Sequence, residues 1–143
     1  MATNTESIIE AYTTISAGGV ALPFGIYADD APIGFLMLGY DEIPGEENLP
    51  IVKGNYCIWR FMIDKHYQGK GYGKEAMKLA IEYVKTFPCG PAKICYLSYE
   101  PENLVAARLY QSFGFEETGE YDGEEKIASL EVCKKAESLQ IEE

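Results

Sequence analysis

The sequence has little of what several classes of protein require. Its 143 residues include only four cysteines and one histidine, His66, and no two cysteines form a C-x-x-C pair. Because a zinc site needs about four clustered nitrogen or sulfur ligands, we expect no metal site. No apolar stretch approaches the roughly 20 residues of a membrane span, and residues 1–10 lack the basic and apolar regions of a signal peptide. These absences predict a cytoplasmic protein without membrane contact, in which the cysteines are small apolar residues.

Positive charge is also scarce. Lysine and arginine number 12 against 23 aspartates and glutamates, which gives a net charge of −11. Such a chain is a poor ligand for nucleic acid, so we expect no nucleic-acid partner. A cationic small molecule suits it better, although acidity that serves solubility alone is the commoner explanation. The length and the 47% apolar content are typical of one domain, here residues 1–143.

The hydrophobic pattern predicts an α/β protein with a mixed sheet and helices on its faces. Residues 56–63 are predicted to form a central strand that is buried on both faces, apart from Arg60. The chain is expected to begin with a helix at 8–15, a hairpin of strands at 24–28 and 33–38, and a loop at 41–54 that leads to the strand at 56–63. A glycine-rich loop at 64–73, a helix at 76–84 and a strand at 94–99 are expected next. The last expected elements are a helix from 103 to about 112 and a hairpin of strands at 115–121 and 127–133, with its turn at 122–123. The charged tail, 134–143, is expected to fray.

The glycine-rich loop is the most informative segment. It reads Gln68-Gly69-Lys70-Gly71-Tyr72-Gly73-Lys74, between a buried strand and an amphipathic helix. Glycines allow backbone amides to approach an anion, and the helix start adds its dipole. A phosphate cradle and an ordinary glycine-rich turn are both compatible with this. The spacing fits neither the P-loop nor the dinucleotide fingerprint.

What the loop does fit is Q-x-x-G-x-G, which resembles the acetyl-CoA pyrophosphate loop of the GNAT superfamily of N-acetyltransferases. A second pattern, Asn103-x-x-Ala106-x-x-Leu109-Tyr110-x-x-Phe113-Gly114-Phe115, resembles that superfamily's other CoA-binding signature. Together the two cover residues 55–121. The amino-acid sequence at 59–64, 67–73 and 97–103 is similar to that of bacterial spermine/spermidine acetyltransferases of this superfamily.

The resemblance implies a GNAT-like fold, acetyl-CoA as co-substrate and no metal. It implies that the strands at 56–63 and 94–99 splay apart around the pantetheine, and that an amide near Phe61 or Met62 polarises the thioester. Tyr110 would donate a proton to the CoA sulfur, and it shares a helix face with Asn103, seven residues earlier. The implied cofactor-binding residues are Met62, Ile63, Gln68, Gly69, Lys70, Gly71, Tyr72, Gly73, Lys74 and Asn103.

The amine side of the site is less well defined by the sequence. Where some polyamine acetyltransferases of the superfamily carry a strand carboxylate, this chain has Trp59. Trp59 and Glu100 are the candidate substrate-binding residues. Glu100, Asp41, Glu42, His66 and a water relay all stay open as the route for the amine proton.

The start of the chain is a second difference from the pattern of the superfamily. The superfamily usually begins with a strand and a helix before the helix at 8–15, and the fold is expected to lack them. A shortened chain, divergence and completion by a partner subunit, for instance in a homodimer, are the alternatives. We therefore expect an acetyl-CoA-dependent N-acetyltransferase of polyamines. A GNAT enzyme for another amine (an aminoglycoside, an amino acid or a protein N-terminus) and a non-catalytic acyl-CoA-binding module remain the alternatives.

Overall fold

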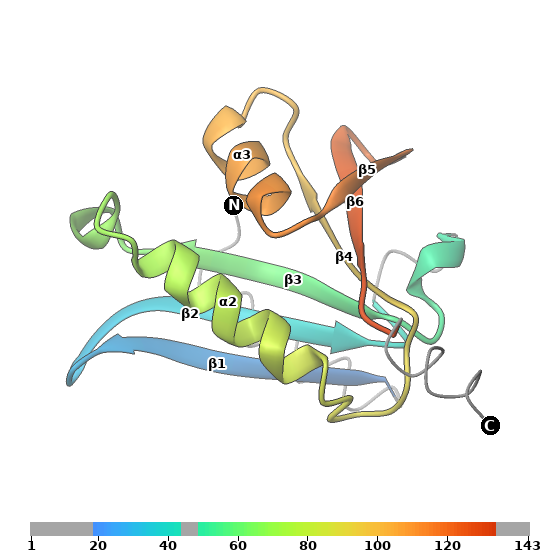
Figure 1. The fold of residues 1–143 in the computed structure, drawn as a ribbon, viewed down its shortest axis with the longest axis horizontal. Coiled ribbons are helices and arrows are strands. Elements are labelled where there is room, and N and C mark those ends of the chain that lie inside the picture. The colour runs from blue at the N-terminus through green and yellow to red at the C-terminus, as the bar shows by residue number, and fades with distance from the viewer. Residues whose placement is uncertain (1–18, 44–48, 134–143) are drawn as a thin grey trace, which may run out of the picture.

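The computed structural model describes residues 19–43 and 49–133 (Figure 1). The helix expected at 8–15 and the tail at 134–143 lie outside the described residues. The elements are β1 (Val20–Ala28), β2 (Ala31–Tyr40), the short 3-10 helix η1 (Pro50–Val52), β3 (Tyr56–Ile63), the 3-10 helix η2 (Lys65–Tyr67), α2 (Tyr72–Val84), β4 (Ile94–Tyr99), α3 (Leu104–Ser112), β5 (Glu116–Asp122) and β6 (Glu125–Glu131). The strands form one six-stranded mixed sheet in the order β1-β2-β3-β4-β6-β5, which confirms the predicted α/β class. No described helix is long and apolar enough to cross a membrane.

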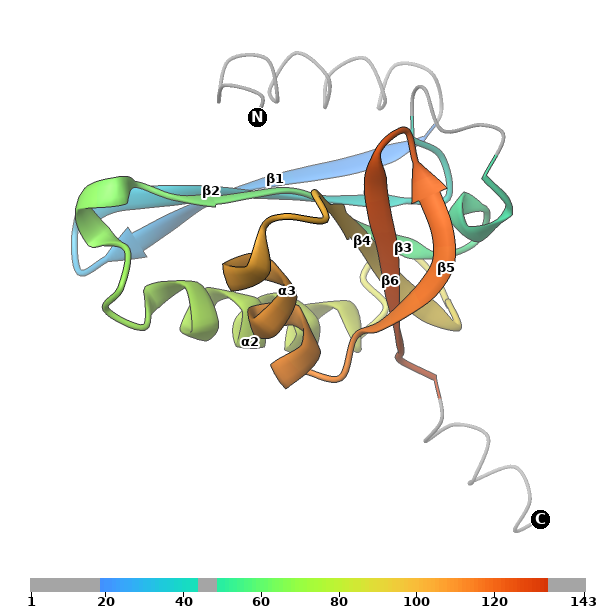
Figure 2. The same cartoon turned by 90° about the horizontal axis from the view of Figure 1, so that it is seen from above.

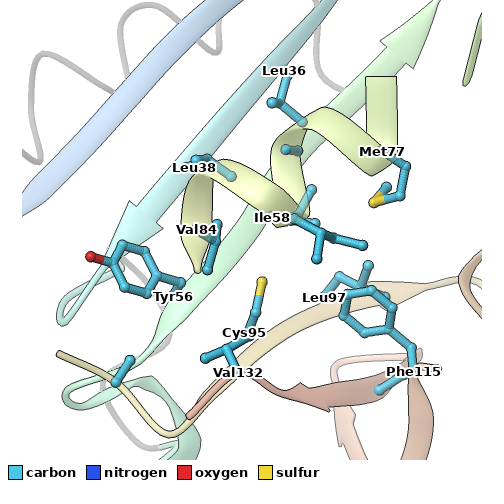
Figure 3. Packing of buried hydrophobic residues seen from close by; sticks show 14 of the residues in the cluster. Leu36, Leu38, Tyr56, Ile58, Met77, Val84, Cys95, Leu97, Phe115 and Val132 are labelled. Carbon is cyan, nitrogen blue, oxygen red and sulfur yellow. The ribbon is translucent and has the colours of Figure 1, made fainter. Parts of the chain in front are cut away.

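Helices α2 and α3 lie on the same face of the sheet (Figure 2). The inner face of α2 buries Met77, Ala80, Ile81 and Val84, at the helical spacing that the sequence predicts. They pack against side chains of β2, β3 and β4, among them Leu38, Ile58 and Leu97 (Figure 3). Each fully buried aliphatic side chain contributes about 1.5–3 kcal/mol. This burial fixes the start of α2, and with it the glycine-rich loop, relative to the end of β3.

Strands β3 and β4 are paired only at their beginnings. Their parallel register joins Tyr56 to Cys95 and Cys57 to Tyr96 and ends there. Strand β3 continues along β2 as far as Ile63, and β4 continues along β6 as far as Tyr99. The sheet therefore opens between β3 and β4, as Figure 1 shows.

This opening corrects one prediction. Strand β3 is not buried on both faces along its length, because only Tyr56, Cys57 and Ile58 are buried and the rest of the strand is half-buried. The β2–β3 register also slips, since Leu38 pairs with Ile58 but Met37 pairs with Arg60. Trp59 is thus an extra residue, a β-bulge of the kind that is common beside active sites.

The C-terminal hairpin has its turn one residue later than predicted. Asp122 pairs with Glu125, so the turn is Gly123-Glu124 instead of Asp122-Gly123. Gly123 has a φ of 63°, which glycine adopts without strain. The shift makes Glu125 the first residue of β6 and brings it into the sheet.

Candidate active site

A cleft with a volume of about 870 Å³ opens where β3 and β4 separate. Its walls come from β3, β4, the start of α3 and the start of β6. It brings together four of the predicted site residues, Trp59, Glu100, Asn103 and Tyr110. The cleft has the strand separation that the resemblance implies for a pantetheine.

Tyr110 lies on α3, on the helix-covered side of the cleft. Its ring packs against Tyr99 (centroids 5.7 Å apart) and Phe115 (6.1 Å). Burial, reinforced by the negative charge of Glu125, raises the pKa of Tyr110 to about 12. The phenol is therefore protonated at any physiological pH, as a proton donor must be.

Asn103 has a structural role that the sequence did not predict. It is the N-cap of α3, and its Oδ1 accepts the backbone N–H of Ala106 at 3.1 Å. Because the cap occupies the side-chain oxygen, the amide NH₂ group is the part that remains for a ligand in the cleft. Asn103 therefore orients α3 and, through it, Tyr110.

The glycine-rich loop is attached to the end of β3. The Gln68 Nε2 donates to the carbonyl oxygen of Ile63 at 2.7 Å. A side chain at Gly73 would lie 3.9 Å from Ile63, so the loop runs close beside this residue. Met62, Ile63 and the loop residues 68–74 thus gather at the outer end of β3. The described lining of the cleft reaches Phe61 on the same strand.

The start of α2 has the features of an anion cradle. Its N-cap is Gly71, with a φ of 88° and no side-chain cap, so the first amide groups of the helix have no acceptor from within the helix. A Cβ at Gly69 or Gly71 would meet nothing within 4 Å, which leaves open space over both positions. Lys70 and Lys74 flank them. The residues present therefore fit a pyrophosphate group.

Trp59 and Arg60 share the face of the sheet opposite the helices. The bulge causes this, because Trp59 packs beside Met37 and Arg60 pairs with Met37. The Arg60 guanidinium lies 5.5 Å from the centroid of the Trp59 ring, and its Nη1 donates to the Trp59 carbonyl oxygen at 2.9 Å. Arg60 also lines the cleft. The sequence analysis did not assign it a role, because a bulge cannot be read from local spacing.

The cleft has an acidic mouth. We use this name for the five carboxylate residues in its lining, which are Glu100, Glu102, Asp122, Glu124 and Glu125. Only Glu100 was a sequence candidate. The hydroxyl of Ser98 donates to Oε1 of Glu125 at 2.7 Å. The contact depends on the β4–β6 register, in which Ser98 is opposite Ile127.

The other sequence candidates for the amine proton lie elsewhere. Asp41 accepts the backbone N–H of Gly54 at 2.8 Å and pairs with Lys53 at 3.3 Å. His66 lies in η2, with its Nδ1 at 3.0 Å from Asp64 Oδ1. The described lining of the cleft includes neither of them, nor Glu42. A search of the described residues finds no group of three His, Cys, Asp or Glu side chains that could hold a metal ion.

The comparisons with known proteins agree with this geometry. Residues 5–115 match the acetyltransferase (GNAT) family. Over 101 residues, 70% of its length, the chain is 42% identical to a probable spermine N(1)-acetyltransferase of Bacillus subtilis subsp. natto (strain BEST195). Over 101 residues it is also 40% identical to a spermine/spermidine N(1)-acetyltransferase of Bacillus subtilis (strain 168). The alignments cover 62% of each of these relatives, so the chain spans less than two thirds of their length.

A solved structure shares the fold. The aminoglycoside acetyltransferase AAC(6')-Ib, crystallised with coenzyme A, superposes with a TM-score of 0.70 at 19% identity, covering 92% of this chain and 80% of that one. The opened sheet, the glycine-rich start of α2 and the match along most of the sequence have one explanation. The chain belongs to the acetyltransferase (GNAT) family.

Proposed function

We propose that the protein is an acetyl-CoA-dependent N-acetyltransferase whose acceptor is a primary amine of a polyamine such as spermine or spermidine. The observation that carries the proposal is the cleft between β3 and β4, whose lining combines a protonated tyrosine with the acidic mouth. The names of the two Bacillus relatives support the choice of amine.

Residues at and near the outer end of β3 would bind acetyl-CoA. The amides of residues 71–74 would hold the pyrophosphate of acetyl-CoA, and the lysines beside them would balance its charge. Acetyl-CoA supplies the acetyl group as a thioester. The backbone of Met62 and Ile63 would align the pantetheine, and an amide near Phe61 would polarise the thioester oxygen.

Tyr110 would act as the general acid. A thiolate that leaves the tetrahedral intermediate needs a proton, and a half-buried phenol in the lining of the cleft can give it. The two neighbouring rings fix the position of the phenol, and the cap at Asn103 fixes its helix. The hydroxyl is thus held in place before the reaction begins.

The acidic mouth favours a polycation over a neutral amine. Five carboxylates line the cleft, against Arg60 as the one cationic residue of the described lining. Opposite charges at such an opening attract a cationic substrate and orient its length along the rim. Trp59 would supply an apolar wall for the methylene chain between two amines.

One observation favours a second candidate acceptor. The Arg60 guanidinium in the lining would suit an amine that also carries a carboxylate, such as an amino acid. Other amines, aminoglycosides and protein N-termini among them, remain alternatives for the same chemistry. A module that binds acyl-CoA without catalysis remains the alternative of a different class.

An acetylation assay with an amine panel tests the proposal. Acetyl-CoA would be offered with spermine, spermidine, an aminoglycoside, a lysine peptide, an amino acid and a neutral arylamine, and release of free thiol would be followed. The expected result is the highest kcat/KM for the polyamines. Turnover of another amine without polyamine turnover would refute the substrate, and CoA binding without any turnover would favour the non-catalytic module.

Two further expectations belong to this proposal. The described cysteines Cys57, Cys89, Cys95 and Cys133 are all free thiols, which supports a reducing compartment such as the cytoplasm. A homodimer is the assembly we propose to test first, by sedimentation of the full chain.

A further inference from the structure

The lining of the cleft includes side chains from both faces of the sheet. Leu97, Tyr99 and Tyr110 belong to the core beneath α2 and α3. Cys57, Tyr96 and Ile127 belong to a second cluster, to which Trp59 is also packed, on the opposite face. A molecule that enters from the second face would therefore meet an acyl group held on the helix side.

Glu125 lies on this second face. It precedes Ile127 by two residues in β6, and residues so spaced in a strand point to the same side. Ser98 is the cross-strand partner of Ile127, and its hydroxyl donates to Glu125 Oε1 at 2.7 Å. This hydrogen bond holds one carboxylate oxygen, while no described residue bonds to Oε2.

The other carboxylates of the acidic mouth lack this arrangement. Glu100, Glu102 and Glu124 are exposed, whereas Glu125 and Asp122 are half-buried; among the described residues the Asp122 carboxylate has no hydrogen-bond partner that would hold it in place. The nearby Glu117 is engaged by the Tyr99 hydroxyl at 3.0 Å and by Lys126 Nζ at 3.5 Å. Glu125 is thus the carboxylate of the mouth that is held in place and has an oxygen to offer.

We propose that Glu125, positioned by Ser98, accepts the proton of the acceptor amine across the cleft from Tyr110. The assignment rests on the proposed function. Glu125 takes a proton from the ammonium group, and the neutral nitrogen attacks the thioester carbon, which forms the C–N bond of a tetrahedral intermediate. The C–S bond breaks as the intermediate collapses, and Tyr110 protonates the thiolate. The second nitrogen proton passes through solvent to restore Tyr110, and Glu125 returns its own proton to solvent, so one proton is released for each amide formed.

Electrostatics places the two groups in one site. The charge of Glu125 is one of the causes of the raised pKa of Tyr110, second to burial. The same charge stabilises the incoming ammonium ion and the proton on Tyr110. Removing it would affect both ends of the proton transfer.

Glu125→Gln tests the assignment, with Glu131→Gln as the matched control. The control changes the same charge on the same strand, at an exposed residue that does not line the cleft. With the best amine of the panel at saturation, kcat of Glu125→Gln should fall about 10²–10⁴-fold, while acetyl-CoA affinity and the thermal midpoint stay near wild type. Glu131→Gln should retain wild-type kcat.

Ser98→Ala tests the positioning step. Its kcat should fall by less than that of Glu125→Gln, and the double variant should be no slower than Glu125→Gln alone, since both changes remove one unit. Additive losses would show that Ser98 acts independently and would overturn its role.

The outcomes also separate this assignment from the proposed function. If wild type acetylates no amine, the proposed function fails. If wild type is active and Glu125→Gln keeps its kcat with only a raised KM, Glu125 binds charge and is not the base. Unchanged kcat and KM would show that Glu125 is only a structural partner of Ser98.

Discussion

At the scale of single residues, the proposed chemistry depends on a tyrosine that stays protonated. An exposed tyrosine has a pKa of about 10 and would already be a serviceable acid at neutral pH. Burial among Tyr99 and Phe115 raises the pKa of Tyr110 to about 12, and the charge of Glu125 adds to this. In its proposed role, Tyr110 would therefore keep its proton even when the amine substrate is mostly deprotonated.

Tyr110→Phe isolates the hydroxyl. The variant keeps the ring contacts, so the fold and the cleft should be preserved. We expect kcat to fall about 10²-fold, with acetyl-CoA affinity nearly unchanged, because only the proton donor is lost. Steady-state kinetics and calorimetry with both proteins measure this. An unchanged kcat, under conditions where the chemical step limits, would make Tyr110 a packing residue only.

The raised pKa of Tyr110 also has a consequence for stability in alkali. Below about pH 10 both the folded and the unfolded chain hold the phenol proton, so stability is unaffected. Above that pH the unfolded chain loses the proton while the folded one keeps it up to about pH 12. The free energy of unfolding should therefore decrease as the pH rises through this window.

Urea unfolding at about pH 9 and about pH 11, on either side of the ordinary tyrosine pKa, measures the decrease. Tyr110→Phe should reduce it, though not abolish it, since burial also raises the pKa of Tyr56 and Tyr99. Tyr121→Phe, at an exposed tyrosine, is the control. If Tyr110→Phe and Tyr121→Phe lose stability over this range as much as wild type does, Tyr110 does not have the raised pKa.

At the scale of elements, the start of α2 decides whether a phosphate can bind. A helix start without a side-chain cap presents amide groups and a positive dipole end to whatever lies above it. The core contacts of Met77 and Val84 hold this helix, and the Gln68 side chain holds the loop to β3. Packing that lies far from the proposed anion site thus fixes its position.

Gly71→Asp and Gly71→Asn together separate charge from backbone strain. Both residues tolerate the left-handed conformation better than others, and they differ only in charge. We expect Asp to weaken acetyl-CoA binding at least tenfold more than Asn does, through repulsion of the pyrophosphate. Calorimetry gives the two dissociation constants.

The control for this pair is Gly119→Asp. Gly119 has a φ of 89° and equally open surroundings, but it lies in β5, away from the loop. It should leave acetyl-CoA binding unchanged. Equal affinities for Gly71→Asp and Gly71→Asn would show that no phosphate sits over this helix start.

Local patterns allowed much of this to be predicted. The alternation and the helical spacing indicated β1 to β4 and α2 within a few residues, and the glycine spacing located the loop. The opening after Cys57 was expected only from the family resemblance, and the bulge at Trp59 was not predicted, because both are properties of the pairing between strands. Glu125 was missed for the same reason. In sequence it is an acid beside a turn, and only the β4–β6 register brings it to Ser98.

At the scale of the whole molecule, charge is distributed unevenly over an acidic chain. The net charge is −11, yet Lys65, Lys70, Lys74 and Lys78 fall within fourteen residues around the glycine-rich loop. The acidic mouth lines the cleft, whereas none of these lysines belongs to the described lining. Under the proposed function, an anionic co-substrate and a cationic acceptor would be attracted to different parts of the site, which would reduce competition between them.

Varying the ionic strength tests whether the electrostatic field of the whole protein helps to capture the cationic substrate. The Debye length falls from about 30 Å at 0.01 M to about 8 Å at 0.15 M, so salt removes long-range attraction and leaves contacts within the cleft. With acetyl-CoA saturating, kcat/KM for spermidine should fall over this range while kcat holds. A monoamine, with less charge to attract, should lose less. If both amines respond alike, the charge of −11 serves solubility and not substrate capture.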